Sequence, residues 1–145
     1  MKQQIIQAGK GQEYDWSKDH VCVKTTLDLT EGRVTVVEDR LKPGFDLARH
    51  YHKKMTEIFY ILEGEVVFAF DDQPEPVLAT RGMTINIPPH VWHHVTSPKG
   101  ATLLTIFSPG GFDRYLSEMA PLSPQQFANE AFMTALAEKY DSWMR

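Results

Sequence analysis

Five of the six histidines of the chain fall into two clusters. The first cluster holds His50 and His52, and the second holds His90, His93 and His94. Residues i and i+2 of a strand point to the same face, so both imidazoles of the first cluster can point at one position. Paired imidazoles of this kind are one way in which a protein holds a divalent metal ion.

Glu57 follows the first cluster after a short bend and offers a carboxylate oxygen that would offset part of a metal's charge. His93 begins a later strand after Pro88-Pro89, so a sheet that curls could place it opposite. Three imidazoles and one carboxylate suit Fe(II), Mn(II), Ni(II), Zn(II) or Cu(II), and the ligand types do not choose among these metals. An isolated H-x-H pair is more often two surface histidines, so the wider spacing decides between the two interpretations.

The residues around both clusters form two motifs. The first motif runs Gly44, five residues, His50, one residue, His52, four residues, Glu57, six residues, Gly64. The second motif runs Gly82, five residues, Pro88, a gap of four residues, His93, three residues, Ser97. These motifs resemble the two signature motifs of the cupin superfamily, and the first motif is a complete match. The resemblance covers roughly residues 20–110.

The resemblance to cupins implies a small antiparallel β-barrel or jelly roll that binds one divalent transition metal (Fe, Mn, Ni, Zn or Cu). Its metal ligands would be His50, His52, Glu57 and His93. We also expect Glu57 to be catalytic, as a weak ligand that leaves the metal and takes a proton from a substrate hydroxyl.

The second motif departs from the family pattern at two positions. His90 stands where a glycine is usual, and Ser97 stands where an asparagine is usual. The glycine serves a tight turn, and histidine adopts a positive φ less readily than glycine does. His94 follows His93 directly, so it should point to the opposite face of the strand and be a structural residue.

Short segments rich in β-branched and aromatic residues alternate with turn residues through the middle of the chain. The expected strands are 21–27, 33–41, 57–62, 65–70, 76–79, 83–88, 93–97 and 101–107. Pro43-Gly44 predicts a type II turn, and Glu63-Gly64 predicts a hairpin with a two-residue loop. Many short strands at regular spacing predict an all-β fold, an antiparallel barrel or jelly roll.

The residues that could line a site inside such a barrel are apolar. Phe59 and Ile61 share the parity of Glu57 along their strand and should face inward with it. Further candidates for the wall are Met83, Ile85, Phe107 and Phe112. For each of these side chains, plain core packing is the simpler role.

Beyond Ser108-Pro109-Gly110-Gly111 the alternation gives way to helix formers, which predict helices over 112–119 and 124–140. Ser123 is a candidate N-cap with Pro124 at the first helical position. We expect the apolar stripe of the second helix to cover one end of the β-core or a dimer partner. The whole chain, 1–145, would be a single cupin domain, with a β-barrel core at about 20–108 and C-terminal helices at about 112–140.

Composition limits the partners of the chain. Its 145 residues suit one domain, and 15 basic against 19 acidic side chains leave a net charge of −4 with no basic face. Binding to nucleic acid or to a membrane surface is therefore not expected. The single cysteine, Cys22, excludes an internal disulfide and fits a cytoplasmic location. The expected partners are a small molecule and a second copy of the chain, since cupins often pair N-terminal strands across a homodimer.

The segment 108–113 and the helix after it resemble small cupins of the quercetin 2,3-dioxygenase-like group. That resemblance implies a metal-dependent dioxygenase acting on a small enolisable or phenolic compound. Two alternatives stay open, namely an isomerase or lyase that uses the metal as a Lewis acid, and a non-catalytic module that binds a small ligand. A cupin sensor of transcription usually carries a DNA-binding domain, for which this sequence has no room.

Overall fold

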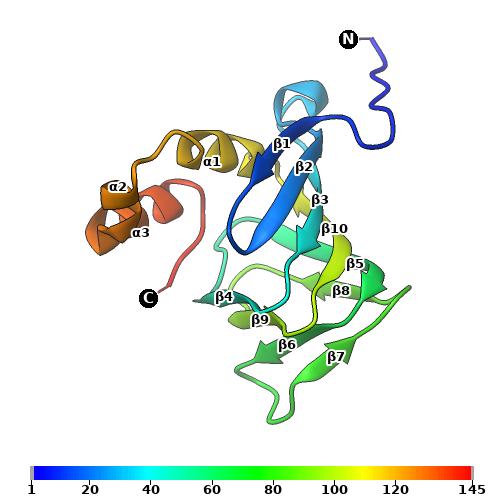
Figure 1. Ribbon diagram of the computed structural model, residues 1–145, viewed down its shortest axis with the longest axis vertical. Coiled ribbons are helices and arrows are strands. Elements are labelled where there is room, and N and C mark those ends of the chain that lie inside the picture. The colour runs from blue at the N-terminus through cyan, green and yellow to red at the C-terminus, as the bar shows by residue number, and fades with distance from the viewer. Residues whose placement is uncertain (1, 145) are drawn as a thin grey trace.

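Two antiparallel β-sheets form the body of the molecule (Figure 1). The computed structural model describes residues 2–144. In spatial order the larger sheet contains β1 (Gln12–Asp15), β2 (Asp19–Thr25), β3 (Thr35–Leu41), β10 (Ala101–Ser108), β5 (Thr56–Gly64) and β8 (Thr84–Ile87). The smaller sheet contains β4 (Phe45–His50), β9 (His93–Ser97), β6 (Val66–Phe70) and β7 (Val77–Ala79). Within residues 2–144 no strand pairing joins the two sheets, so the predicted all-β fold is a jelly roll and not a closed barrel.

The predicted hairpin at Glu63-Gly64 is wrong. β5 continues through Gly64 and pairs with β10 and β8, whereas β6 pairs with β7 and β9 in the other sheet. Gly64 has a φ of 83°, and a Cβ atom at this position would lie 2.6 Å from the carbonyl oxygen of Gly100. The chain therefore bends from one sheet to the other at a position where only glycine fits.

The other turns and strands agree more closely with the sequence. Gly44 has a φ of 86°, and the N–H of Phe45 donates to the carbonyl oxygen of Lys42 at 3.0 Å, so the predicted turn is confirmed. A 3-10 turn, η1 (Asp28–Thr30), precedes β3. The structure also contains β1, a strand that the pattern did not indicate, paired with β2 in the same chain.

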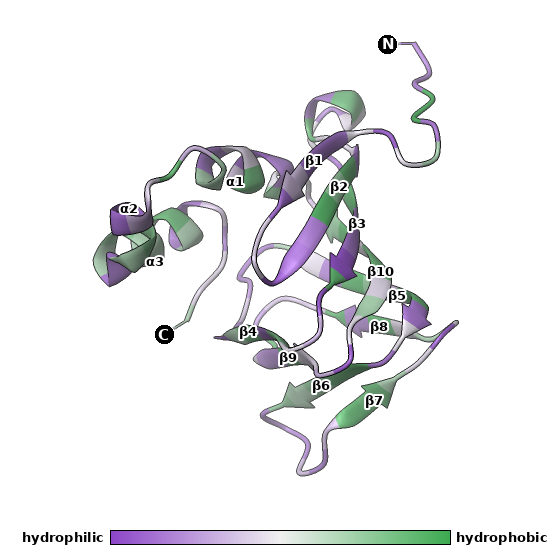
Figure 2. Ribbon diagram, viewed as in Figure 1, coloured by the Kyte–Doolittle hydropathy of each residue, from purple (hydrophilic) through white to green (hydrophobic). Residues whose placement is uncertain are grey.

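Alternation along the strands builds the core between the sheets. On β5 the inward side chains include Phe59 and Ile61, which are buried as predicted. They pack with Phe68 of β6 and Val95 of β9 in the main core cluster. Figure 2 shows the largely hydrophobic strands β6 and β7 in green. A second cluster, which includes Phe107, lies where the first helix covers the larger sheet.

Three helices follow the last strand and lie together beside the sheets (Figure 1). α1 (Phe112–Met119) has the predicted bounds. The single helix predicted over 124–140 is instead two, α2 (Pro124–Ala128) and α3 (Glu130–Lys139). Asn129 breaks it because its ψ is 101°, and its side chain caps the N-terminus of α3. None of the helices within residues 2–144 is long and apolar enough to cross a membrane.

The start of α2 confirms the predicted cap. The side chain of Ser123 accepts the N–H of Gln126, and the side chain of Gln126 in turn accepts the N–H of Ser123. Pro124 occupies the first helical position, where its missing N–H costs no hydrogen bond.

Asp39 and Asp19 form a partly buried pair of carboxyl groups between β3 and β2. Asp39 shares the inner face of β3 with Val37 and Leu41, and its Oδ1 atom has no hydrogen-bond partner among the described residues. Burial, together with the neighbouring Asp19 carboxylate, raises the pKa of Asp39 to about 9. The folded protein therefore holds Asp39 protonated at neutral pH, whereas the unfolded chain releases that proton near pH 4.

This pair predicts that the protein loses stability as the pH rises. A group whose pKa is raised by folding contributes fully below its unfolded pKa, and that contribution is lost as the pH rises toward the folded value of about 9. Asp39→Asn should therefore raise the thermal midpoint at pH 8 more than at pH 5. Thermal denaturation at both pH values tests this, with Asp72→Asn in an exposed turn as the control. Equal effects of Asp39→Asn at both pH values would contradict it.

Candidate metal centre

The four predicted ligands come from both sheets and from the segment that joins them. His50 is the last residue of β4 and His93 is the first residue of β9, and the two are cross-strand partners in the smaller sheet. Glu57 lies on β5, facing them from the larger sheet. His52 lies in the connection between β4 and β5. The spacing of the first motif thus brings side chains from both sheets to one place in the interior.

The ligand atoms of these four residues form a compact and buried group. All of them lie within 4.8 Å of one another. The side chains are almost inaccessible to solvent, and none of the four residues is more than 7% exposed. The Oε2 atom of Glu57 lies 3.6 Å from Nε2 of His52, and its Oε1 atom lies 3.4 Å from Nε2 of His93. The structure therefore brings together the whole predicted set.

Backbone carbonyl groups orient the three imidazoles. The Nδ1 atoms contact the carbonyl oxygens of Ala48 (from His50, 2.8 Å), Val91 (from His93, 2.9 Å) and Asp141 (from His52, 2.7 Å). A carbonyl oxygen only accepts hydrogen bonds, so each Nδ1 carries a proton, and in the neutral form of each imidazole Nε2 keeps a free lone pair. Histidines that bind metals are commonly held in this way by their second nitrogen.

Three buried polar atoms of the cluster lack a hydrogen-bond partner among the described residues. They are Nε2 of His52, Oε1 of Glu57 and Nε2 of His93. A buried polar atom without a partner costs about 1–3 kcal/mol, so three at one point require an explanation. A divalent metal ion is a partner that all three can share, and its preference for imidazole nitrogen and carboxylate oxygen fits the donors present.

Burial and mutual attraction set the charges in the cluster. Burial alone would raise the pKa of the Glu57 carboxyl, but the imidazoles of His52 and His93 outweigh it and hold this pKa well below its usual range. Burial lowers the pKa of His50 to about 4. Burial also opposes the charged form of His52, but Glu57 outweighs it and raises the pKa of His52. Glu57 is therefore anionic at neutral pH and can offset the charge of a metal ion.

Asp141, in the segment after α3, is a contributor that the sequence did not indicate. Its carbonyl oxygen holds His52, and its carboxylate accepts the backbone N–H groups of Lys53, Lys54 and Met55 at 2.8–2.9 Å. Burial alone would raise the pKa of Asp141, but these hydrogen bonds outweigh it and lower the pKa. Local patterns did not point to this residue because it lies more than 80 positions along the chain from its partners.

The remaining histidines lie outside the cluster. His94 points away from His93, as predicted, and its Nε2 pairs with Asp46 at 2.7 Å. His90 has a φ of 68°, so it adopts the left-handed backbone that a glycine would favour. Its N–H donates to the carbonyl oxygen of His52 at 2.6 Å, and the local turn is formed despite the substitution. His20 lies on β2 beside acidic side chains of β1.

Aromatic side chains separate one side of the cluster from the helices. Phe107, the cross-strand partner of Glu57, lies edge-on to His52 with ring centroids 6.5 Å apart. Phe112 of α1 stacks on Phe107 at 4.2 Å. Of the other candidates for the wall, Ile85 packs against the main core, whereas Met83 is 36% exposed and does not face inward.

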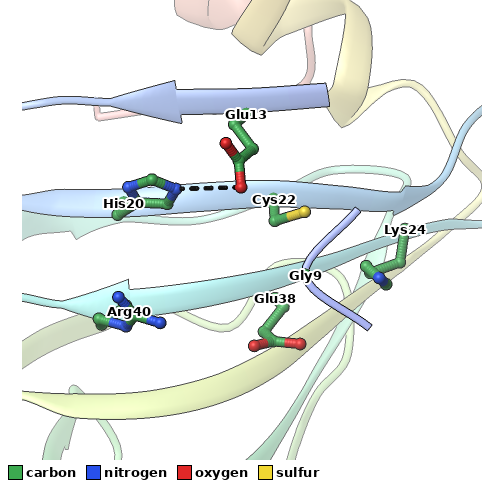
Figure 3. A pocket seen from close by; sticks show the side chains of 7 residues that line it. All are labelled: Gly9, Glu13, His20, Cys22, Lys24, Glu38 and Arg40. Atoms are coloured by element: carbon green, nitrogen blue, oxygen red, sulfur yellow. Dashed lines mark ion pairs between the residues drawn. The ribbon is translucent and has the colours of Figure 1, made fainter. Parts of the chain in front are cut away.

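A hollow lies on the outer face of β1, β2 and β3 (Figure 3), and no residue of the histidine cluster lines it. Its lining residues are Gly9, Glu13, His20, Cys22, Lys24, Glu38 and Arg40. The N-terminal segment covers part of this face, because Cys22 donates to the carbonyl oxygen of Lys10. His20 lies 3.7 Å from Glu13. Among the described residues the group of possible metal-ligand atoms is the histidine cluster, and this hollow holds none of its members.

The fold and the cluster together define a small jelly-roll protein with three histidines and one glutamate inside it. Residues 37–107 match the cupin domain family. This range includes all four residues of the cluster. Residues 37–107 are therefore a cupin domain, as the two motifs predicted. Among curated proteins no match to the sequence is found.

Solved structures of cupins and related enzymes share this fold. An RmlC-like cupin from Shewanella frigidimarina is 22% identical, with 77% of this chain and 96% of that chain covered and a TM-score of 0.63. Ectoine synthase from P. lautus is 17% identical, with 77% and 84% covered and a TM-score of 0.64. A predicted oxalate decarboxylase from Thermotoga maritima is 16% identical, with 73% and 99% covered and a TM-score of 0.66. At these identities the likeness concerns the fold alone.

Proposed function

We propose that the chain is a metal-dependent enzyme that binds one divalent transition metal through His50, His52, Glu57 and His93. The observation that carries this proposal is the convergence of three Nε2 lone pairs and one carboxylate on a buried point. The orphaned polar atoms of the same residues support it. We further propose that residues 1–145 act as a single domain, since α1 packs on the sheet that carries Glu57.

Glu57 is the proposed catalytic residue. A bound metal would polarise an oxygen of the substrate or, if it is redox-active, bind dioxygen. Glu57 is anionic at neutral pH and could accept a proton from an acidic hydroxyl of a substrate. An enol or a phenol has such a hydroxyl, and this favours a small enolisable or phenolic substrate. The buried aromatic wall at Phe107 would keep water from that side of the site.

The reaction proposed for this site is oxygenative cleavage of such a compound by a dioxygenase-type mechanism. Protein reconstituted separately with iron, manganese, nickel, copper and zinc should be given a panel of small enols and phenols. Oxygen uptake should require metal and substrate together, and Glu57→Gln should abolish it. Product formation without oxygen uptake would overturn the dioxygenase proposal. Ligand binding without any turnover would favour the non-catalytic binding module.

An isomerase or lyase that uses the metal as a Lewis acid is the second candidate. The observation that favours it comes from the proteins of similar fold, whose names include a synthase and a decarboxylase. Lewis-acid chemistry needs only that the metal polarise a substrate oxygen while Glu57 moves a proton. Zinc-loaded protein that converts substrate under nitrogen would distinguish this candidate from the first.

We also propose that the protein is a homodimer in the cytoplasm. The outer face of the larger sheet carries Val36, Ile58, Tyr60, Leu104 and Ile106. Apolar side chains on an outer sheet face are typical of a surface that another protein covers. Light scattering should then give twice the 16.6 kDa mass of one chain. The cytoplasmic location rests on the lone Cys22 alone.

A further inference from the structure

The three histidines of the cluster are held in two different ways. The Nδ1 atoms of His50 and His93 bond to carbonyl oxygens two residues earlier in the chain. Each of these two contacts forms within its own short segment of the chain. His52 instead bonds to the carbonyl oxygen of Asp141, which lies 89 positions further along the chain. The orientation of His52 therefore depends on where the C-terminal segment lies.

The carboxylate of Asp141 also fixes the loop that leads from His52 to Glu57. Oδ1 accepts the N–H of Lys53 at 2.9 Å, and Oδ2 accepts those of Lys54 at 2.8 Å and Met55 at 2.9 Å. Backbone N–H groups in a loop have no strand partner, so a carboxylate that accepts three of them holds the loop in one conformation. One residue thus acts on both cluster members that flank this loop.

The segment around Asp141 is itself attached to the same region. Trp143 forms a β-bridge with Tyr51, with both N–H to carbonyl distances at 2.9 Å. The indole Nε1 of Trp143 donates to Oδ1 of Asp141 at 3.1 Å, and Nζ of Lys53 lies 3.3 Å above the indole ring. Asp141 has a φ of 64°, a conformation that Asp and Asn adopt more readily than most residues.

We propose that Asp141 is a positioning residue of the metal centre. Its carbonyl oxygen keeps the proton of His52 on Nδ1 and so directs Nε2 into the cluster, and its carboxylate sets the distance between His52 and Glu57 by fixing the loop. This inference rests on the proposed function of the four residues as metal ligands.

The test measures the affinity of Co²⁺ for the wild type and for two variants. Asp141→Asn keeps the left-handed backbone and one acceptor oxygen, and Asp141→Ala removes both oxygens. Loss of a group that orients a metal ligand typically weakens metal binding about 10- to 100-fold, and we expect this range with the larger loss for alanine. The visible absorption of the bound Co²⁺ should change as well.

A matched control separates positioning from a general loss of structure. Asp113 of α1 likewise accepts a backbone N–H, from Leu27 at 3.1 Å, and a hydroxyl, from Thr35 at 2.7 Å, but it contacts no cluster residue. Asp113→Asn should lower the thermal midpoint while retaining the wild-type affinity for Co²⁺. Equal losses of affinity in Asp113→Asn and Asp141→Asn would overturn the inference.

A second measurement compares the Nδ1 protons of the three histidines within the same protein. In zinc-loaded protein, ¹H–¹⁵N spectra of the imidazoles should show protons on Nδ1 of all three histidines. In Asp141→Asn only the Nδ1 proton of His52 should exchange faster with solvent. The hydrogen bonds from Nδ1 of His50 and His93 are local and should not change. A wild-type His52 without a proton on Nδ1 would overturn the inference even if no variant folds. Wild type that binds neither Co²⁺ nor Zn²⁺ would overturn the proposed function and the inference with it, whereas wild-type affinity in Asp141→Asn would overturn the inference alone.

Discussion

Glu57→Gln should weaken the binding of Co²⁺ more than any other conservative substitution in the chain. Glu57 is the one anionic member of the cluster and is only 4% exposed, so its amide variant leaves a buried dication with neutral ligands. Breaking a buried ion pair by removing one partner costs about 3–5 kcal/mol, which is roughly two to three and a half orders of magnitude in affinity. Competition with a chromophoric chelator measures it.

The control for this substitution lies on the same strand. Glu63→Gln changes an exposed carboxylate near the other end of β5 and should leave the affinity for Co²⁺ unchanged. If Glu57→Gln bound Co²⁺ as tightly as this control does, Glu57 would not be a ligand. The remaining three histidines would then have to hold the metal alone.

Phe107→Ala should give the largest loss of stability among substitutions near the site. Phe107 is 2% exposed and belongs to the second core cluster, where it stacks on Phe112 and lies edge-on to His52. Replacing a buried phenylalanine with alanine removes its transfer free energy and leaves a cavity, at a cost of about 3–5 kcal/mol. Urea denaturation should show this as a lower midpoint with an unchanged slope.

An exposed phenylalanine supplies the comparison. Phe127 on α2 is 42% exposed, so Phe127→Ala should change the free energy of unfolding by less than about 1 kcal/mol. Similar midpoints for Phe107→Ala and Phe127→Ala would show that α1 does not seal this end of the jelly roll.

Local sequence patterns predicted the bounds of strands and helices better than they predicted which strands pair. The alternation in β9 and the helix formers in α1 gave the observed bounds, because side-chain parity and helix propensity are local properties. The hairpin predicted at Glu63-Gly64 was wrong because a turn signal does not say whether the next strand stays in the same sheet. At Asn129 a helix cap competes with continuation of the apolar stripe, and the cap prevails.

The candidate site was predictable as far as its residues share a motif. His50, His52 and Glu57 lie close together in sequence, and the structure buries all three at one place. The pairing of His50 with His93 across two strands followed only from the resemblance to cupins, since no local rule places two distant strands side by side. The role of Asp141 could not be predicted from the sequence, because it comes from tertiary contacts of a segment outside both motifs.

Metal content is the most direct test of the proposed site. Natively purified wild type and the His50→Ala/His52→Ala double variant should be compared by inductively coupled plasma mass spectrometry, with circular dichroism to check the fold of both. We predict near-stoichiometric transition metal in the wild type and background levels in the variant, because two of four ligands and their Nε2 donors are lost. Wild type that stays without metal even after metal is supplied, or a folded variant that keeps the metal, would contradict the assignment of these residues as a metal centre.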